Sequence, residues 1–282
     1  MTPIQIAFAL VQAAATPPPV TPAPTQTPTP TLAQSRFRAC AEQTRVAPER
    51  AVETANAWRV EGGGLDARQC LGLAYVELGR WRAAATVYEQ AAREAATAQD
   101  PRGTMFWVQS GNAWLAADEG TKAIEAFDSA LANPQLTDEL RGEVHLDRAR
   151  ALVALANPAG ARTDIDRALQ LVPSDPMAWY LSAALAARQD QLPRAATDIA
   201  RARQLAANDP DVLLLAGTIA GLQGNGAEAE RLYRQVAAAA PDTDAGRRAA
   251  AALGSARDGP AGTARVPATT SPPPPTRPAQ GR

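Results

Sequence analysis

Residues 176–209 read PMAWYLSAALAARQDQLPRAATDIARARQLAAND, and their pattern of small and large apolar residues recurs along the middle of the chain. Ala195 stands 34 residues after Ala161 and 34 residues before Ala229. The same step links two further sets, which are Ile165, Ile199 and Tyr233, and Ala168, Ala202 and Val236. A fixed period of this kind indicates tandem copies of one structural unit.

The composition of the units favours packed helices over strands. Alanine supplies much of the 46% hydrophobic content, whereas aromatic residues make up only 5%. Small residues allow helix backbones to approach closely, and a chain poor in β-branched and aromatic residues cannot build many strands. The small positions are Gly72, Gly111, Ala149, Ala183 and Gly217, each followed by an alanine of the next predicted helix. Ala84, Tyr88 and Ala91 show the spacing of four and then three that makes one apolar helical stripe.

The 34-residue period, the small residues and the large residues between them resemble the tetratricopeptide repeat family. The resemblance implies an all-α fold, a right-handed α-solenoid of tandem helix–turn–helix units. We expect a degenerate helical hairpin at 33–64, five units within 65–243 and a capping helix at 244–254. The five expected units are 65–99, 104–137, 142–175, 176–209 and 210–243.

The two ends are not expected to belong to the repeats. Residues 1–15 contain a short apolar run followed by alanines, which resembles a secretory signal peptide, although no Lys or Arg precedes the run. Residues 16–32 are rich in proline and threonine, and residues 255–282 are rich in proline, so we expect both segments to be disordered. We therefore expect an exported, periplasmic protein without stable membrane insertion after signal removal; the alternative is a cytoplasmic protein.

The sequence offers no equipment for catalysis. It contains no glycine-rich phosphate loop ending in Lys-Ser or Lys-Thr, no His-Glu-x-x-His and no Cys-x-x-Cys. His145 is the only histidine, which excludes a site built on two histidines, and we interpret it as a packing residue between helices. Asp164 and Asp166 lie two apart on a predicted helix and point to different faces, so they cannot form an acid–base pair. We expect no enzyme activity, no cofactor and no metal, and a net charge of −1 gives no attraction for nucleic acid.

The resemblance implies a scaffold that binds a protein or peptide segment in a concave groove lined by the first helix of each unit. The positions that match this groove give a predicted contact set of Met105, Val108, Asn112, Arg150, Tyr180 and Arg188. Some members of the family use lysines and asparagines as a carboxylate clamp, but only Asn112 fits that pattern here. Two alternatives remain, which are an architectural subunit of an envelope assembly that uses its convex face, and an accessory subunit of an enzyme.

A disulfide between Cys40 and Cys70 is expected from the register of the repeats. Cys40 falls on the first helix of the degenerate hairpin, and Cys70 falls on the first helix of the next unit. Such helices are neighbours in the stack, and an exported chain with two cysteines favours a bridge.

Overall fold

The computed structural model describes residues 31–258, which fold into thirteen α-helices and contain no strand. The expected signal peptide, almost all of the linker at 16–32 and most of the tail at 255–282 lie outside the described residues. The helices are α1 (Leu32–Val46), α2 (Pro48–Val60), α3 (Gly64–Glu77), α4 (Trp81–Ala98), α5 (Gly103–Ala116), α6 (Gly120–Leu131), α7 (Asp138–Ala154), α8 (Pro158–Leu171), α9 (Pro176–Arg188), α10 (Leu192–Leu205), α11 (Pro210–Leu222), α12 (Gly226–Ala239) and α13 (Asp244–Asp258).

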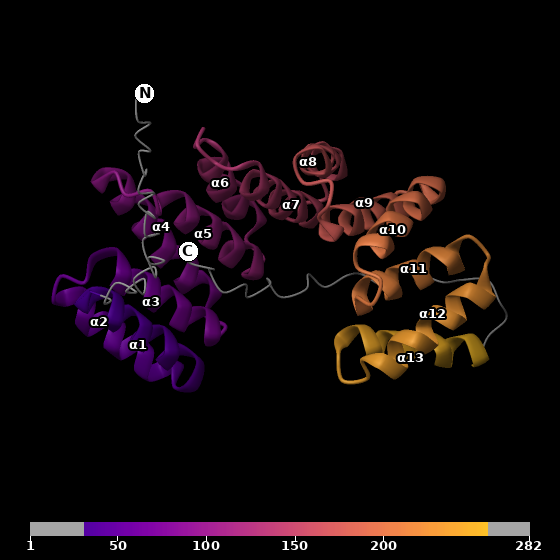
Figure 1. Ribbon diagram of the computed structural model, residues 1–282, viewed down its shortest axis with the longest axis horizontal. Helices are drawn as coiled ribbons and strands as arrows, with labels where there is room; N and C mark the ends of the chain where they lie inside the picture. The colour runs from indigo at the N-terminus through magenta and orange to yellow at the C-terminus, as the bar shows by residue number, and fades with distance from the viewer. Residues whose placement is uncertain (1–30, 259–282) are drawn as a thin grey trace, which may run out of the picture.

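Each helix from α2 to α13 packs against the helix before it, and this confirms the predicted all-α solenoid. The stack curves into an arch with α1 and α13 at its two ends, and α6 and α8 lie along the outer edge in the view of Figure 1. Because contacts run almost entirely between neighbours in the sequence, the chain has no single central core. Apolar clusters instead follow one another along the solenoid, as in other repeat proteins.

Glycines of the first helices make room for rings of the second helices. A Cβ atom added at Gly72 would lie 2.4 Å from Cε1 of Tyr88, and one added at Gly111 would lie 2.5 Å from Cε1 of Phe127. Both rings are almost fully buried. The close approach of the two helices in these units therefore depends on the absence of a side chain at the glycine.

Proline and aspartate set the starts of two first helices. Pro176 and Pro210 occupy the first turn of α9 and α11, where no backbone donor is needed. The preceding residues, Asp175 and Asp209, cap these helices through their side-chain oxygens. Both first helices therefore begin at a proline.

The first helix, α1, buries few of its side chains. Only Cys40 and Thr44 of α1 are buried. Cys40 lies beside Cys70 of α3, with the two Cα atoms 6.1 Å apart, which is a separation that a disulfide spans. No helix within residues 31–258 has both the length and the apolar character that crossing a membrane requires.

Candidate partner-binding face

Five residues of the predicted contact set lie on one side of the first helices α5, α7 and α9. They are Met105, Asn112, Arg150, Tyr180 and Arg188. Counted from the start of each unit, these positions are spaced by three or four residues, which places them on a single helix face. We call this side of α5, α7, α9 and α11 the inner face. The sequence prediction places the groove on this side.

Two methionines mark the exposed apolar part of the inner face. Met105 of α5 is 40% exposed, and Met177 of α9, which stands at the same position of its own unit, is 46% exposed. Val108, which was also expected in the contact set, is only 8% exposed and packs in the core around α4, α5 and α6. The equivalent residues of α7 and α11, Leu146 and Leu214, are buried as well. Tyr180 occupies this repeat position in α9 and is partly buried against the core, so the position serves mainly the packing between units.

A polar cluster joins α5 to α7 on the inner face. Arg150 donates a hydrogen bond to Oδ1 of Asp147 over 3.1 Å, and Asn112 of α5 hydrogen-bonds to the same carboxylate. Burial raises the pKa of Asp147, and the charge of Arg150 together with hydrogen bonds from Asn112 and Arg150 only partly offsets this effect. The carboxylate is therefore less well stabilised than one in water.

The same cluster contains two buried side-chain oxygens without a hydrogen-bond partner among residues 31–258. These are Oε1 of Gln109 and Oδ1 of Asn112, which lie one turn apart on α5. Leaving a buried acceptor unpaired costs about 1–3 kcal/mol. Two unpaired acceptors thus lie beneath the surface of the inner face, in the same cluster as a poorly compensated carboxylate.

A second polar group lies further along the inner face, between α9, α11 and α13. Burial raises the pKa of Tyr180, and the nearby negative charge of Asp211 adds to the shift. Burial also raises the pKa of Asp211, with Asp209 and Asp244 contributing repulsion and Arg248 opposing it. Arg188 is exposed at the end of α9 and contributes only a small charge effect at Tyr180.

Sequence reasoning missed Gln109, Asp147, Met177 and Asp211 as members of this face. A usable signal was present, because Gln109 and Asn112 are three residues apart, as are Asp147 and Arg150. Met177 also stands at the repeat position of Met105. The repeat identifies the positions that share a face, but it does not indicate which polar side chains pair there.

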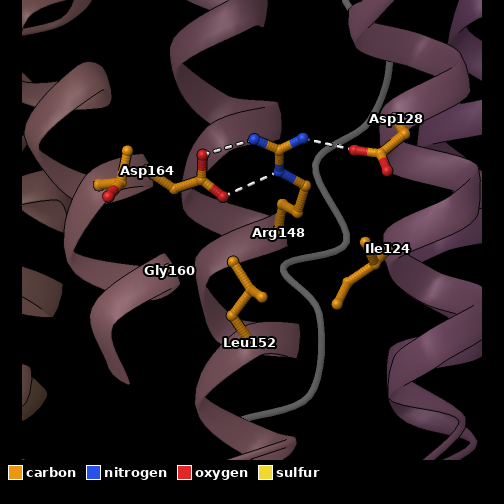
Figure 2. Close-up of a pocket in the computed structure, with 7 residues that line it drawn as sticks. Ile124, Asp128, Arg148, Leu152, Gly160 and Asp164 are labelled. Atoms are coloured by element: carbon orange, nitrogen blue, oxygen red, sulfur yellow. Dashed lines mark hydrogen bonds and ion pairs between the residues drawn. The ribbon is translucent and has the colours of Figure 1, made fainter. Parts of the chain in front are cut away.

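The outer side carries a different site, a hollow of about 320 Å³ between α6 and α8, with α7 beneath it. Its lining residues are Ile124, Asp128, Arg148, Leu152, Gly160, Thr163 and Asp164, and we call this set the α6–α8 joint. Figure 2 shows the guanidinium of Arg148 bridging Asp164 and Asp128, with Ile124 and Leu152 beside it.

Arg148 holds Asp164 by two hydrogen bonds, from Nε to Oδ2 over 2.8 Å and from Nη2 to Oδ1 over 2.7 Å. His145 Nδ1 lies 2.9 Å from Oδ1 of the same carboxylate, so the histidine pairs with an acid as well as packing between helices. Although burial opposes it, hydrogen bonding to Arg148 and His145 holds the pKa of Asp164 below its usual range. Asp166 faces elsewhere and pairs with Arg162 and Arg194.

Within residues 31–258, no group of three or more His, Cys, Asp or Glu side chains is arranged to hold a metal ion. The arrangements described above can bind hydrogen-bond donors and apolar side chains. They contain no nucleophile paired with a base.

The chain matches the family model described as Tetratricopeptide repeat over residues 71–136 and again over residues 146–211. Among solved structures it is similar to PilW, described as a widely conserved type IV pilus biogenesis factor, with a TM-score of 0.63, 18% identity, and coverage of 78% of this chain and 99% of that chain. It is also similar to Pseudomonas aeruginosa pilF, with a TM-score of 0.58, 17% identity, and coverage of 78% and 99%. A thermophilic TPR protein of Thermus thermophilus gives a TM-score of 0.55 at 20% identity over 67% of this chain and 98% of that chain. No curated protein matches the sequence.

Proposed function

Because this chain is a tetratricopeptide repeat protein, we propose that it is a non-catalytic scaffold that holds an extended segment of a partner protein against its inner face. One observation carries the proposal, which is the pair of unpaired, buried oxygens of Gln109 and Asn112 beside Asp147. If these two amide side chains turn toward the surface, their oxygens can accept hydrogen bonds from the backbone N–H groups of an extended segment. Every residue except proline supplies one such donor.

The apolar and aromatic side chains of the same face would supply contact area. Met105 and Met177 flank the polar cluster, and methionine adapts to partners of different shape because its side chain is unbranched and flexible. Tyr180 and Arg188 belong to the residue types that dominate binding energy at interfaces.

The charges of the inner face argue against capture of a carboxylate. The only lysine of the chain, Lys122, lies on α6 and pairs with Glu119. Asp147 and Asp211 place negative charge on the face, which offsets the positive charge of Arg150 and Arg188 there. The proposed partner segment therefore binds through its backbone and apolar side chains rather than through an anionic C-terminus.

We also propose that the protein is exported to the periplasm and that Cys40 and Cys70 form a disulfide there. The proximity of the two cysteines supports the bridge, and disulfides persist in oxidising compartments. N-terminal sequencing of the native protein is expected to find a start near Thr16, and alkylation without reductant is expected to find no free thiol. Retention of Met1, or two titratable thiols, would contradict this part of the proposal.

Site-specific crosslinking tests the inner face in the native host. A photoreactive residue placed at Met105 or Met177 is expected to capture one partner, whereas the same residue at Arg201, which is exposed on α10 and bonds to Gln204, is expected to capture none. Crosslinks confined to Arg201 would refute inner-face binding and favour the architectural alternative.

Substitutions then measure the contribution of single side chains with the captured partner segment. Asn112→Ala, and separately the double change Tyr180→Ala with Arg188→Ala, are expected to weaken binding by at least ~1 kcal/mol, about fivefold, when binding is measured well below the Tm of each variant. Arg201→Ala is the matched arginine control and should bind like the wild type. Unchanged binding by both inner-face variants would rule out the contact set.

A further inference from the structure

The repeat provides an internal comparison for the α6–α8 joint, because the next joint along the solenoid, between α8 and α10, has the same layout. Asp198 stands 34 residues after Asp164, and Thr197 stands 34 residues after Thr163. Asp128 and Asp166 occupy equivalent positions of successive units, because each directly follows the large residue of its second helix, Phe127 or Ile165. Both joints therefore contain two carboxylates at equivalent places.

Two arginines neutralise the carboxylates of the α8–α10 joint. Arg194 contacts Asp166 over 2.8 Å and Asp198 over 3.4 Å. Arg162 contacts the same Asp166 over 2.7 Å and donates to Ser182 over 2.9 Å. Two guanidinium groups thus match two carboxylates, and their stems occupy the space between the second helices.

The α6–α8 joint has only one guanidinium for its two carboxylates. Gly160 stands 34 residues before Arg194 and leaves that arginine's place without a side chain. Ile124 stands at the repeat position of Arg162 and supplies an apolar side chain instead. Arg148 is the single arginine of the joint and reaches both Asp164 and Asp128. The hollow of about 320 Å³ lies in this joint.

The carboxylate left for an additional cation is that of Asp128. Its side chain is 54% exposed, and it bonds to Arg148 through Oδ1 only, so Oδ2 has no partner within residues 31–258. Asp164, in contrast, is 3% exposed and is held by Arg148 and His145 through three hydrogen bonds. Ile124 and Leu152 add an apolar surface next to Asp128, as Figure 2 shows.

We propose that the α6–α8 joint is a binding site for an arginine side chain carried by a protein segment. Its guanidinium binds Asp128 as Arg194 binds Asp166, and its methylene stem lies against Ile124 and Leu152. Arginine fits better than lysine because its guanidinium is more weakly hydrated and can donate to Oδ2 of Asp128 in a fixed planar geometry while its stem packs against apolar side chains. The site is independent of the inner face, since Arg148 and Arg150 are two residues apart on α7 and point to nearly opposite sides.

Methyl NMR of the full-length chain with a small probe tests the chemistry directly. N-acetyl-arginine-N-methylamide is expected to shift the δ1-methyl signal of Ile124 saturably. The lysine analogue should bind more weakly, and the neutral citrulline analogue, which has nearly the same shape, at least tenfold more weakly. No saturable shift with the arginine probe, or equal shifts with citrulline, would overturn the proposal.

Two variants locate the bound group. Asp128→Asn should weaken binding of the arginine probe at least tenfold, whereas Asp166→Asn in the neighbouring joint should leave the Ile124 response intact. Gly160→Arg recreates the arrangement of the α8–α10 joint and should abolish probe binding. Because a Cβ at this position meets Nδ2 of Asn157 at 2.9 Å, Gly160→Ala measures that cost separately and should retain binding. Unchanged binding in both Asp128→Asn and Gly160→Arg would refute the assignment.

The arginine can come from this chain or from another protein, and one further variant separates the two sources. Residues 259–282 contain Arg265, Arg277 and Arg282 and no acidic residue. If these residues supply the side chain, replacing all three by glutamine shifts the Ile124 signal before any probe is added and raises the probe's apparent affinity. If another protein supplies it, the variant and the wild type give the same signal and the same affinity.

Discussion

Gly111→Ala tests the packing principle on which the units depend. The added Cβ would lie 2.5 Å from Cε1 and 2.7 Å from Cδ1 of Phe127, whose ring is fully buried between helices and cannot move aside freely. Overpacking of this kind costs about 1–3 kcal/mol, whereas alanine favours a helix over glycine by roughly 0.5–1 kcal/mol. We therefore expect a net loss of about 1–2 kcal/mol in the local free energy of unfolding.

The same substitution at Gly221 provides the matched control. Gly221 lies near the end of α11, and the nearest atom to an added Cβ is Cβ of Ala229 at 3.8 Å, which is an ordinary contact. Only the helix preference then remains, so Gly221→Ala should stabilise its region by roughly 0.5–1 kcal/mol. One chemical change is thus expected to have opposite signs at the two positions.

Hydrogen exchange of the amides in α5, α6, α11 and α12 is the appropriate assay, because repeat arrays unfold in parts. A Phe127→Leu background removes the ring atoms that clash, so Gly111→Ala should cost at least ~0.5 kcal/mol less there than in the wild type. The reasoning is refuted if Gly111→Ala stabilises as Gly221→Ala does, or if its cost is the same in both backgrounds.

Further predictions concern strain, the cysteines and pH. Ala156 has a φ of 55°, so Ala156→Gly is expected to raise the free energy of unfolding by about 0.5–1 kcal/mol, measured by denaturant titration. If the proposed bridge forms, reducing Cys40 and Cys70, which are 30 residues apart, should lower the stability of α1–α3 by about 3–4 kcal/mol, seen as faster hydrogen exchange there. Asp164, with its lowered pKa, stabilises the fold above the unfolded-state pKa and ceases to do so as pH falls through the folded-state pKa, so Asp164→Asn should lower the Tm at pH 7 and change it little in acid. The raised pKa of Asp147 means that the stability of the fold falls as pH rises toward the folded-state pKa and this carboxyl ionises. Asp147→Asn should therefore raise the Tm at pH 7. Equal changes in Tm for Asp164→Asn and Asp147→Asn would contradict these two predictions.

The fold could be predicted because the 34-residue period links residues that must be small where the two helices of a unit cross. A Cβ added at Gly72 would clash with the ring of Tyr88, and Ala84 is fully buried, so small residues recur at these positions and the period is visible in the sequence itself. The repeat also predicts which positions share the inner face, and the burial of Val108, a member of the predicted contact set, has a physical cause. That position faces the neighbouring unit, and the sequence does not state how closely successive first helices approach.

The polar pairing could not be predicted in the same way. Asp164 and Asp166 were correctly expected to face apart, but nothing in a single sequence indicates that Arg148 rather than a residue of α8 neutralises Asp164. The choice depends on side-chain reach across three helices. Comparison of equivalent positions, Gly160 with Arg194, could have suggested the hollow once the helices were paired.

Helix α7 shows how two chemically different sites can lie close together in one repeat. Arg148 and Arg150 are turned by about 200° from each other on the helix, so one serves the α6–α8 joint and the other serves the inner face. A side chain that fills the joint without moving α7 should not affect the inner face. Gly160→Arg is therefore expected to abolish arginine binding at the joint while leaving crosslinking from Met105 unchanged. Loss of both would instead mean that binding at the joint shifts α7, and that the two sites are energetically coupled.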